Sequence, residues 1–237
     1  MTTKRLRPIV GGLGIATAIS MLVTLYLGLV WSPPERTMGD TIRILYFHAP
    51  SAWASYLAVG VVAIASILYL WRRTHVWDII ALASAEIGVL FTTITLISGM
   101  LWGKLEWGTY WTWDARLTSF LIMWLIYVGY LMLRSALDDP ERRARLAAIV
   151  GIVGALDIPI IHFAVLWWRT LHPQPIVVRP GGPAMSEPMV LALVAGMLSF
   201  TLVYVFLMAL RVSLEVERDR IEVAAHPQPV TAEVQPS

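Results

Sequence analysis

Residues 188–210 read PMVLALVAGMLSFTLVYVFLMAL, a run without one charged side chain. A helix of about 20 apolar residues crosses the roughly 30 Å hydrocarbon core of a bilayer. Such runs recur along the 237-residue chain, in which 57% of residues are hydrophobic and 14% are charged, a composition unlike that of soluble domains. The sequence therefore predicts an all-α polytopic membrane protein with six transmembrane helices, at 9–31, 49–71, 78–101, 118–134, 146–166 and 188–210.

The two ends of the chain fit this interpretation. Three basic residues precede the first apolar run, as in a signal peptide, but the run continues to Trp31 and no clear cleavage site follows, so it is predicted to be a span. After Arg211 the sequence becomes mixed in charge and then rich in proline, which predicts a short helical extension and a disordered end. We expect one membrane domain, residues 1–211, and a partly disordered cytoplasmic tail, 212–237.

Charge and composition narrow the function further. The chain has no cysteine, which excludes disulfides, thiolate metal sites and cysteine nucleophiles. No nucleotide-binding motif is present, so a partner must supply any energy source. The segments on the same side of the membrane as the N-terminus carry twice as many Lys and Arg residues as the segments on the opposite side. By the positive-inside rule, both termini lie in the cytoplasm and three long, aromatic-rich loops face outward. Function is expected on the outer face.

One outer segment, residues 107–119, reads WGTYWTWDARLTS and is unusually dense in aromatic side chains. If it is helical, Trp107, Trp111 and Asp114 share one face with Tyr110 beside them, and Gly108 opens the helix or lets a ligand approach closely. Such a face would hold a flat apolar ring by stacking. The alternative is that these residues, with Trp113, are ordinary interfacial anchors. The tryptophan-rich segment 102–118 is our candidate for one wall of a site.

Two histidines are predicted to lie outside at similar depth. His48 is in YFHAP, where Pro50 suits the first turn of the second span, and His172 is in WWRTLHPQP, where Pro173 indicates that the fifth helix has ended. Two neutral imidazoles on opposite sides of a haem iron complete its axial coordination. The alternative is that each histidine is hydrogen-bonded to loop backbone.

His162 is different because it lies within the fifth predicted span. An ionisable group there is a functional candidate, since burying it in the bilayer is costly. Pro159 precedes it by three residues, so His162 is predicted to have a structural role, bonding a carbonyl freed near that proline. Asp157 is a candidate partner. His75 and His226 are interpreted as incidental.

Arg43 lies five residues before His48, and Arg116 lies at the end of the tryptophan-rich segment; both are predicted to be outside. Both are candidates to pair with ligand carboxylates, because a guanidinium forms fork-shaped contacts with carboxylate oxygens. Snorkelling to lipid headgroups is the alternative for each. Haem combines an apolar ring, an iron that takes axial donors and two anionic propionates, so the candidate set matches its chemistry.

These residues carry a family resemblance. The segment WGTYWTWDARLTS resembles the WWD signature of the cytochrome c assembly family of haem-handling membrane proteins. Together with the six-span layout, the sequences YFHAPSAW and PIIHFAVLWWRTLHPQ are similar to the haem exporter protein C (CcmC) group within that family. The resemblance extends over most of residues 10–210. Tyr110 stands where a further tryptophan is expected, and an aromatic face is retained.

The resemblance implies a multi-pass protein of the bacterial inner membrane that binds haem b on the periplasmic side. His48 and His172, rather than His162, match the family's axial ligands, and Arg43 and Arg116 match its propionate-binding arginines. Trp107, Tyr110, Trp111, Trp113 and Asp114 match its tryptophan platform. The implied partners are the haem chaperone CcmE, the ABC transporter subunits CcmA and CcmB, and the small accessory subunit CcmD.

Three other functions are left open by the sequence. A cytochrome c synthase-type haem lyase would deliver haem directly to the apocytochrome, but those relatives are longer and have further histidines. A secondary transporter of a small substrate would have charged, broken helices meeting at the midplane, whereas Glu86, Asp157 and His162 are the main polar residues within these spans. A purely structural subunit would tolerate changes in the tryptophan-rich segment. Whether the chain is an enzyme is undecided; it reads as a haem transfer scaffold without an independent catalytic motif.

Overall fold

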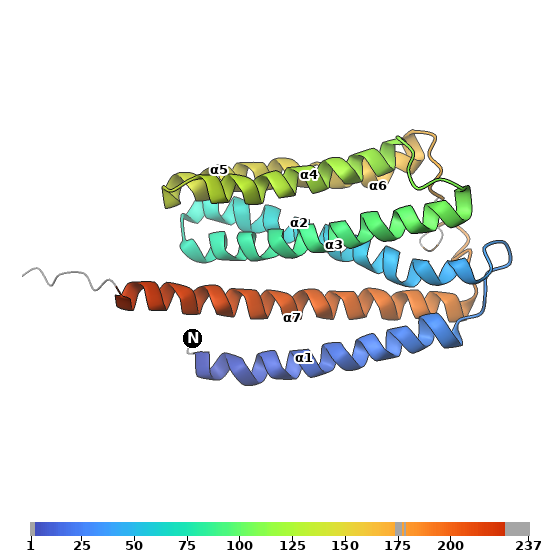
Figure 1. The fold of residues 1–237 in the computed structure, drawn as a ribbon, viewed down its shortest axis with the longest axis horizontal. Coiled ribbons are helices and arrows are strands. Elements are labelled where there is room, and N and C mark those ends of the chain that lie inside the picture. The colour runs from blue at the N-terminus through green and yellow to red at the C-terminus, as the bar shows by residue number, and fades with distance from the viewer. Residues whose placement is uncertain (1–2, 174–176, 178, 226–237) are drawn as a thin grey trace, which may run out of the picture.

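The computed structural model describes residues 3–173, 177 and 179–225. Six helical spans are long and apolar enough to cross a membrane, which confirms the predicted all-α polytopic fold (Figure 1). Most run several residues past their predicted ends. The helices are α1 (Thr3–Tyr26), α2 (Leu45–Arg72), α3 (His75–Trp107), α4 (Ala115–Ala136), α5 (Pro140–Ala155), α6 (Asp157–Trp167) and α7 (Glu187–Ala225). The predicted disordered end, 226–237, lies outside the described residues.

Local sequence signals set several helix boundaries. Asp114 precedes α4 and its carboxylate accepts a hydrogen bond from the Leu117 amide, 2.9 Å away, which satisfies an otherwise unpaired donor of the first turn. Asp139 does the same for α5, with Pro140 at the first helical position, where proline's missing N–H costs nothing. Gly108 ends α3 with a φ of 73°, a left-handed conformation that glycine adopts without strain.

The fifth span is divided in two. α5 ends at Ala155 and α6 begins at Asp157, with Leu156 in a turn between them. Pro159 lies in the first turn of α6, and proline both lacks an N–H and crowds the carbonyl four residues earlier. The sequence predicted a freed carbonyl near Pro159 but not this interruption of the helix.

α2 is the centre of the bundle. It packs against α3, α5 and α7, while α1 packs mainly on α7 (Figure 1). The largest group of buried side chains lies between α2, α3, α4 and α5 and includes Val59, Val62, Met123, Tyr127 and Tyr130. Glycines permit close contact there; a Cβ on Gly151 of α5 would lie 2.8 Å from a Val62 methyl.

Two ion pairs lie within the spans. Arg134 of α4 donates two hydrogen bonds to the Asp78 carboxylate of α3, at 2.5 and 2.8 Å, with both side chains under 10% exposed. Arg211 of α7 pairs with Glu86 of α3 at 2.6 Å. These ion pairs join α3 to α4 and to α7 and satisfy charges that would otherwise be costly in a bilayer.

The two ends of the bundle differ. The start of α1 and the end of α7 lie at one end, where the short connections α2–α3 and α4–α5 also lie (Figure 1). The three longer connections, α1–α2, α3–α4 and α6–α7, gather at the opposite end. The histidines and tryptophans singled out in the sequence belong to this second end, so the fold places them near one another.

Candidate ligand site at the loop end of the bundle

His48 lies on α2, one turn inside the helix. A short 3₁₀ segment, Asp40–Ile44, leads directly into α2 at Leu45. The prediction that Pro50 occupies the first turn is therefore wrong; Pro50 is in the second turn. Because proline donates no hydrogen bond, the Tyr46 carbonyl loses its helical partner, and Gly196 of α7 packs there. A Cβ on Gly196 would lie 3.0 Å from that carbonyl oxygen.

The imidazole of His48 is oriented by α3. Its Nδ1 lies 3.1 Å from the hydroxyl oxygen of Ser98, which itself donates to the Ile94 carbonyl at 2.7 Å. Since the Ser98 proton is already engaged, Ser98 accepts from Nδ1–H, and Nε2 of His48 is left without a proton. The Trp102 ring contacts the imidazole edge-on, with centroids 5.7 Å apart. His48 therefore presents a bare nitrogen, as a metal ligand must.

His172 approaches from the connection between α6 and α7. Its Nδ1 lies 3.2 Å from the Pro173 carbonyl oxygen, an atom that only accepts, so Nδ1 carries the proton and Nε2 is again bare. Burial, followed by the positive charge of Arg116, lowers the pKa of His172 to about 3. His172 is consequently neutral at physiological pH. Both predicted ligands thus have the tautomer that suits metal binding through Nε2.

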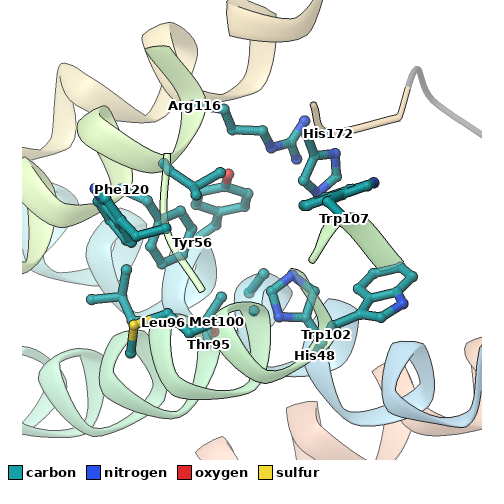
Figure 2. Close-up of a pocket in the computed structure, with 14 residues that line it drawn as sticks. His48, Tyr56, Thr95, Leu96, Met100, Trp102, Trp107, Arg116, Phe120 and His172 are labelled. Carbon is teal, nitrogen blue, oxygen red and sulfur yellow. The ribbon is translucent and has the colours of Figure 1, made fainter. Parts of the chain in front are cut away.

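Two joined cavities lie between these histidines. Both are lined by His48, Ala52, Tyr56, Trp102, Arg116 and His172. The larger has a volume of about 420 Å³, within the range of about 300–1,000 Å³ of small-molecule sites. Figure 2 shows His172 and Arg116 on one side of this space, and His48 with Trp102 on the opposite side. The structure brings the two histidines together, since they line the same cavities; their role as ligands stays a prediction.

The tryptophan-rich segment is not helical. α3 ends at Trp107 and α4 begins at Ala115, and residues 108–114 between them form an irregular connection. The condition under which Trp107, Trp111 and Asp114 would share one helical face is therefore not met, because Gly108 turns the chain out of the helix. The connection instead folds back, and Trp107 and Trp111 both reach the cavity wall.

The other members of the predicted platform lie away from the cavities. Tyr110 and Trp113 are exposed; the Lys104 ammonium lies 5.4 Å from the Tyr110 ring centre, and the Trp113 ring meets that of Trp111 edge-on. Asp114 caps α4. Their predicted roles toward a ligand stay predictions.

The two arginines are separated. Arg116, in the first turn of α4, lines both cavities. Arg43 is not among the lining residues of either; it pairs with Asp40 at 2.9 Å and donates to the Gly28 and Leu29 carbonyls in Leu27–Trp31, the π-helical turn that follows α1. A cation at a helix C-terminus is favourable, which accounts for this position. The propionate role of Arg43 stays a prediction.

Tyr56 and Trp102 are lining residues that the sequence did not single out, whereas Trp111 was predicted. Tyr56, Trp102 and Trp111 each have a buried polar atom without a hydrogen-bond partner among the described residues, and all three line the cavity. Such atoms are costly unless a ligand or water satisfies them. Tyr56 lies two turns after His48 on α2, so helical spacing carried a signal for it. Trp102 was missed because, in the sequence, it resembles an ordinary residue at the end of an apolar span.

His162 also lines the larger cavity, on the α6 side. Its ring contacts Phe163 edge-on, with centroids 5.0 Å apart. The described residues provide no hydrogen bond from His162 to Asp157 or to a freed carbonyl, and Asp157 Oδ2 is itself buried without a partner. The structural role expected for His162 is therefore not supported by a bond in the structure.

The fold and site together define a class: a multi-pass membrane protein with a histidine- and tryptophan-lined ligand cavity at one end of a six-span helical bundle. The family model described as "Heme exporter protein C" matches residues 2–226. The chain belongs to the heme exporter protein C family, which confirms the resemblance seen in its sequence.

Individual relatives agree with this assignment. The protein named heme exporter protein C from Bradyrhizobium diazoefficiens is 42% identical over 88% of this chain and 79% of its own length. Proteins of the same name from Haemophilus influenzae and Escherichia coli K12 are 37% and 38% identical, over 89% and 73% of this chain and 87% and 72% of their own lengths.

Proposed function

We propose that the chain binds haem b as cargo in the cavity between His48 and His172 and delivers it for the maturation of c-type cytochromes. The name of its relatives, heme exporter protein C, supports this cargo. The single observation that carries the proposal is the pairing of two histidines, each with a bare Nε2, across one cavity. Two imidazoles are the ligand set of a six-coordinate haem.

The remainder of the cavity suits the other parts of a haem. Trp107, Trp111 and Phe120 offer apolar faces to a macrocycle. The Arg116 guanidinium and the Tyr56 hydroxyl lie on one side of the space (Figure 2). The buried N–H groups of Trp102 and Trp111 have no acceptor among the residues that the structure describes. Carboxylates accept hydrogen bonds from such groups, so the haem propionates are the partners we assign to them.

We place this cavity at the periplasmic side of the bacterial inner membrane. The excess of basic residues at the opposite end of the bundle supports that orientation. There the chain would present haem to the chaperone CcmE, in a complex with the ABC transporter subunits CcmA and CcmB and the small subunit CcmD. The exposed Tyr110 and Trp113 side chains lie beside the cavity end of the bundle, where they are available to a docking protein.

The experiment is complementation in cells that lack the corresponding gene. The wild-type chain should restore haem-loaded chaperone and c-type cytochromes, measured by haem staining after denaturing electrophoresis. His48→Ala and His172→Ala should each abolish both products, whereas His75→Ala, a histidine at the opposite end of the bundle, should not. Restoration of cytochromes by both ligand variants would contradict the proposal.

A further inference from the structure

The two proposed ligands are attached to the protein in different ways. His48 belongs to the central helix, and its contacts come from a second helix, α3. His172 belongs to a connection, and its ring nitrogen bonds to the carbonyl of the next residue in the chain. This difference bears on which ligand the protein keeps when haem leaves, a question that rests on the proposed function.

Three neighbours on α3 fix the ring of His48. Ser98 accepts the Nδ1 proton, and Trp102 contacts the ring edge-on. Gly99 packs closely against another side of the imidazole ring, since a Cβ at Gly99 would lie 2.9 Å from Cε1 of His48. The imidazole is thus held by a hydrogen bond and by close packing. Such contacts fix the tautomer and ring orientation of a metal ligand and raise its basicity.

The backbone around His48 is fixed as well. Ser51 donates to the His48 carbonyl at 2.8 Å and also meets the Thr95 hydroxyl of α3 at 2.8 Å. Moving His48 would require α2 and α3 to separate, and the interface between these two helices is the most extensive in the fold. Moving His172 requires only a local change in a connection, because its Nδ1 partner moves with it.

We propose that His48 is the haem ligand that the protein retains, that His172 is the ligand exchanged when haem is handed on, and that Ser98 and Gly99 are positioning residues for His48. An incoming donor from the receiving protein would take the axial position that His172 leaves. The retained His48 keeps the cargo oriented until that exchange is complete.

The tautomer is tested without haem. In purified haem-free protein with ¹⁵N-labelled histidine, His48→Gln identifies the His48 resonances. We expect shifts of a protonated Nδ1 and a bare Nε2, and Ser98→Ala should allow both tautomers. A protonated Nε2 in the wild type would overturn the assignment of Ser98. This readout does not depend on haem binding, so it separates failure of the inference from failure of the proposed function.

Binding of carbon monoxide tests which of the two histidines leaves the haem iron. Carbon monoxide occupies one axial position of ferrous haem, and resonance Raman frequencies of the Fe–CO unit report the ligand on the opposite side. We expect the wild-type adduct to match that of His172→Ala and to differ from that of His48→Ala. A wild-type adduct that matches His48→Ala would overturn the proposal. A wild type without six-coordinate haem would instead contradict the proposed function itself.

Ser98 provides a second readout in case a histidine variant does not fold. Ser98→Ala should shift the Fe–CO frequencies of the otherwise wild-type protein, because the ligand opposite carbon monoxide is then the altered His48. It should also move the midpoint potential of the bis-histidine form to a more positive value, since a less basic ligand stabilises ferric iron less. Ser98→Thr, which keeps the hydroxyl, should restore both. Unchanged frequencies and potential in Ser98→Ala would overturn the positioning role.

Discussion

Gly99 of α3 faces the imidazole of His48 so closely that a methyl group cannot be added without displacing it. An ideal Cβ at Gly99 would lie 2.9 Å from His48 Cε1 and 3.5 Å from Nδ1. Distances below about 3.0 Å to a Cβ are essentially never seen in close-packed interiors. The sequence SGMLW, which looks like an ordinary end of an apolar span, therefore controls the geometry of a proposed metal ligand.

Gly99→Ala should weaken haem binding by about 10- to 100-fold, the range seen when contacts that orient a metal ligand are altered. The reason is that the added methyl group tilts the His48 ring away from its hydrogen bond with Ser98. Titration of the purified protein with haemin measures the effect. Gly60→Ala is the matched control, since nothing lies within 4 Å of a Cβ there; equal affinities in the two variants would contradict the claim.

Tyr56→Phe should raise the haem Kd about 10- to 100-fold, because a hydrogen bond to a charged group contributes about 1.5–3 kcal/mol. The Tyr56 hydroxyl is buried in the cavity beside Arg116, and the anionic haem propionate is the acceptor we assign to it. The same change at Tyr26, which is exposed on α1, should have no effect. A haem derivative with alkyl groups in place of the propionates lacks the acceptor and should bind both proteins alike; a persisting difference would speak against a propionate contact.

Arg134→Leu should lower the free energy of unfolding by about 3–5 kcal/mol, since it leaves the Asp78 carboxylate buried and unpaired. Chemical denaturation in detergent micelles measures this change. Replacing Asp78 with Leu in the same protein should recover most of the loss, because the isolated charge is removed. A double variant no more stable than Arg134→Leu would show that the ion pair does more than neutralise Asp78.

Acid should destabilise the fold through His172. Its folded-state pKa of about 3 lies below the ordinary value of 6.5, so between these pH values the folded protein binds fewer protons than the unfolded one. Stability contributed by neutral His172 is therefore complete above about pH 6.5 and falls as the pH decreases toward 3. The unfolding temperature of haem-free protein should show this slope, and His172→Gln should reduce it. An unchanged slope would exclude His172 as the source.

The fold was largely predictable because its signals are local and strong. Long uncharged runs such as 188–210 have no alternative to a membrane helix, and Asp114, Asp139 and Gly108 mark helix ends with recognisable chemistry. The division of the fifth span at Leu156 was not predicted. A membrane helix can accommodate a proline in several ways. The packing of α5 and α6 on α4 selects the interruption seen at Leu156.

The sequence singled out the two histidines that meet at the cavity but only some of the other residues that line it. His48 and His172 are polar residues near the ends of predicted spans. The predicted topology places both on the same side of the membrane. The sequence left open whether the segment after Trp107 is helical, because its aromatic spacing fits a helical face whereas Gly108 favours a break. Ser98 and Gly99 act through three-dimensional contacts with His48, and a serine and a glycine within an apolar helix carry no distinct signal of such a role. For Tyr56 the one signal was its helical spacing from His48.

The absorption spectrum of the purified, haem-loaded protein tests the central claim most directly. The wild type should show the low-spin spectrum of six-coordinate haem with two histidine ligands. His48→Ala and His172→Ala should each lose it, while His162→Ala, which changes a residue outside the proposed ligand pair, should retain it. A wild type that takes up no haem, or unchanged axial ligation in both His48→Ala and His172→Ala, would contradict the account.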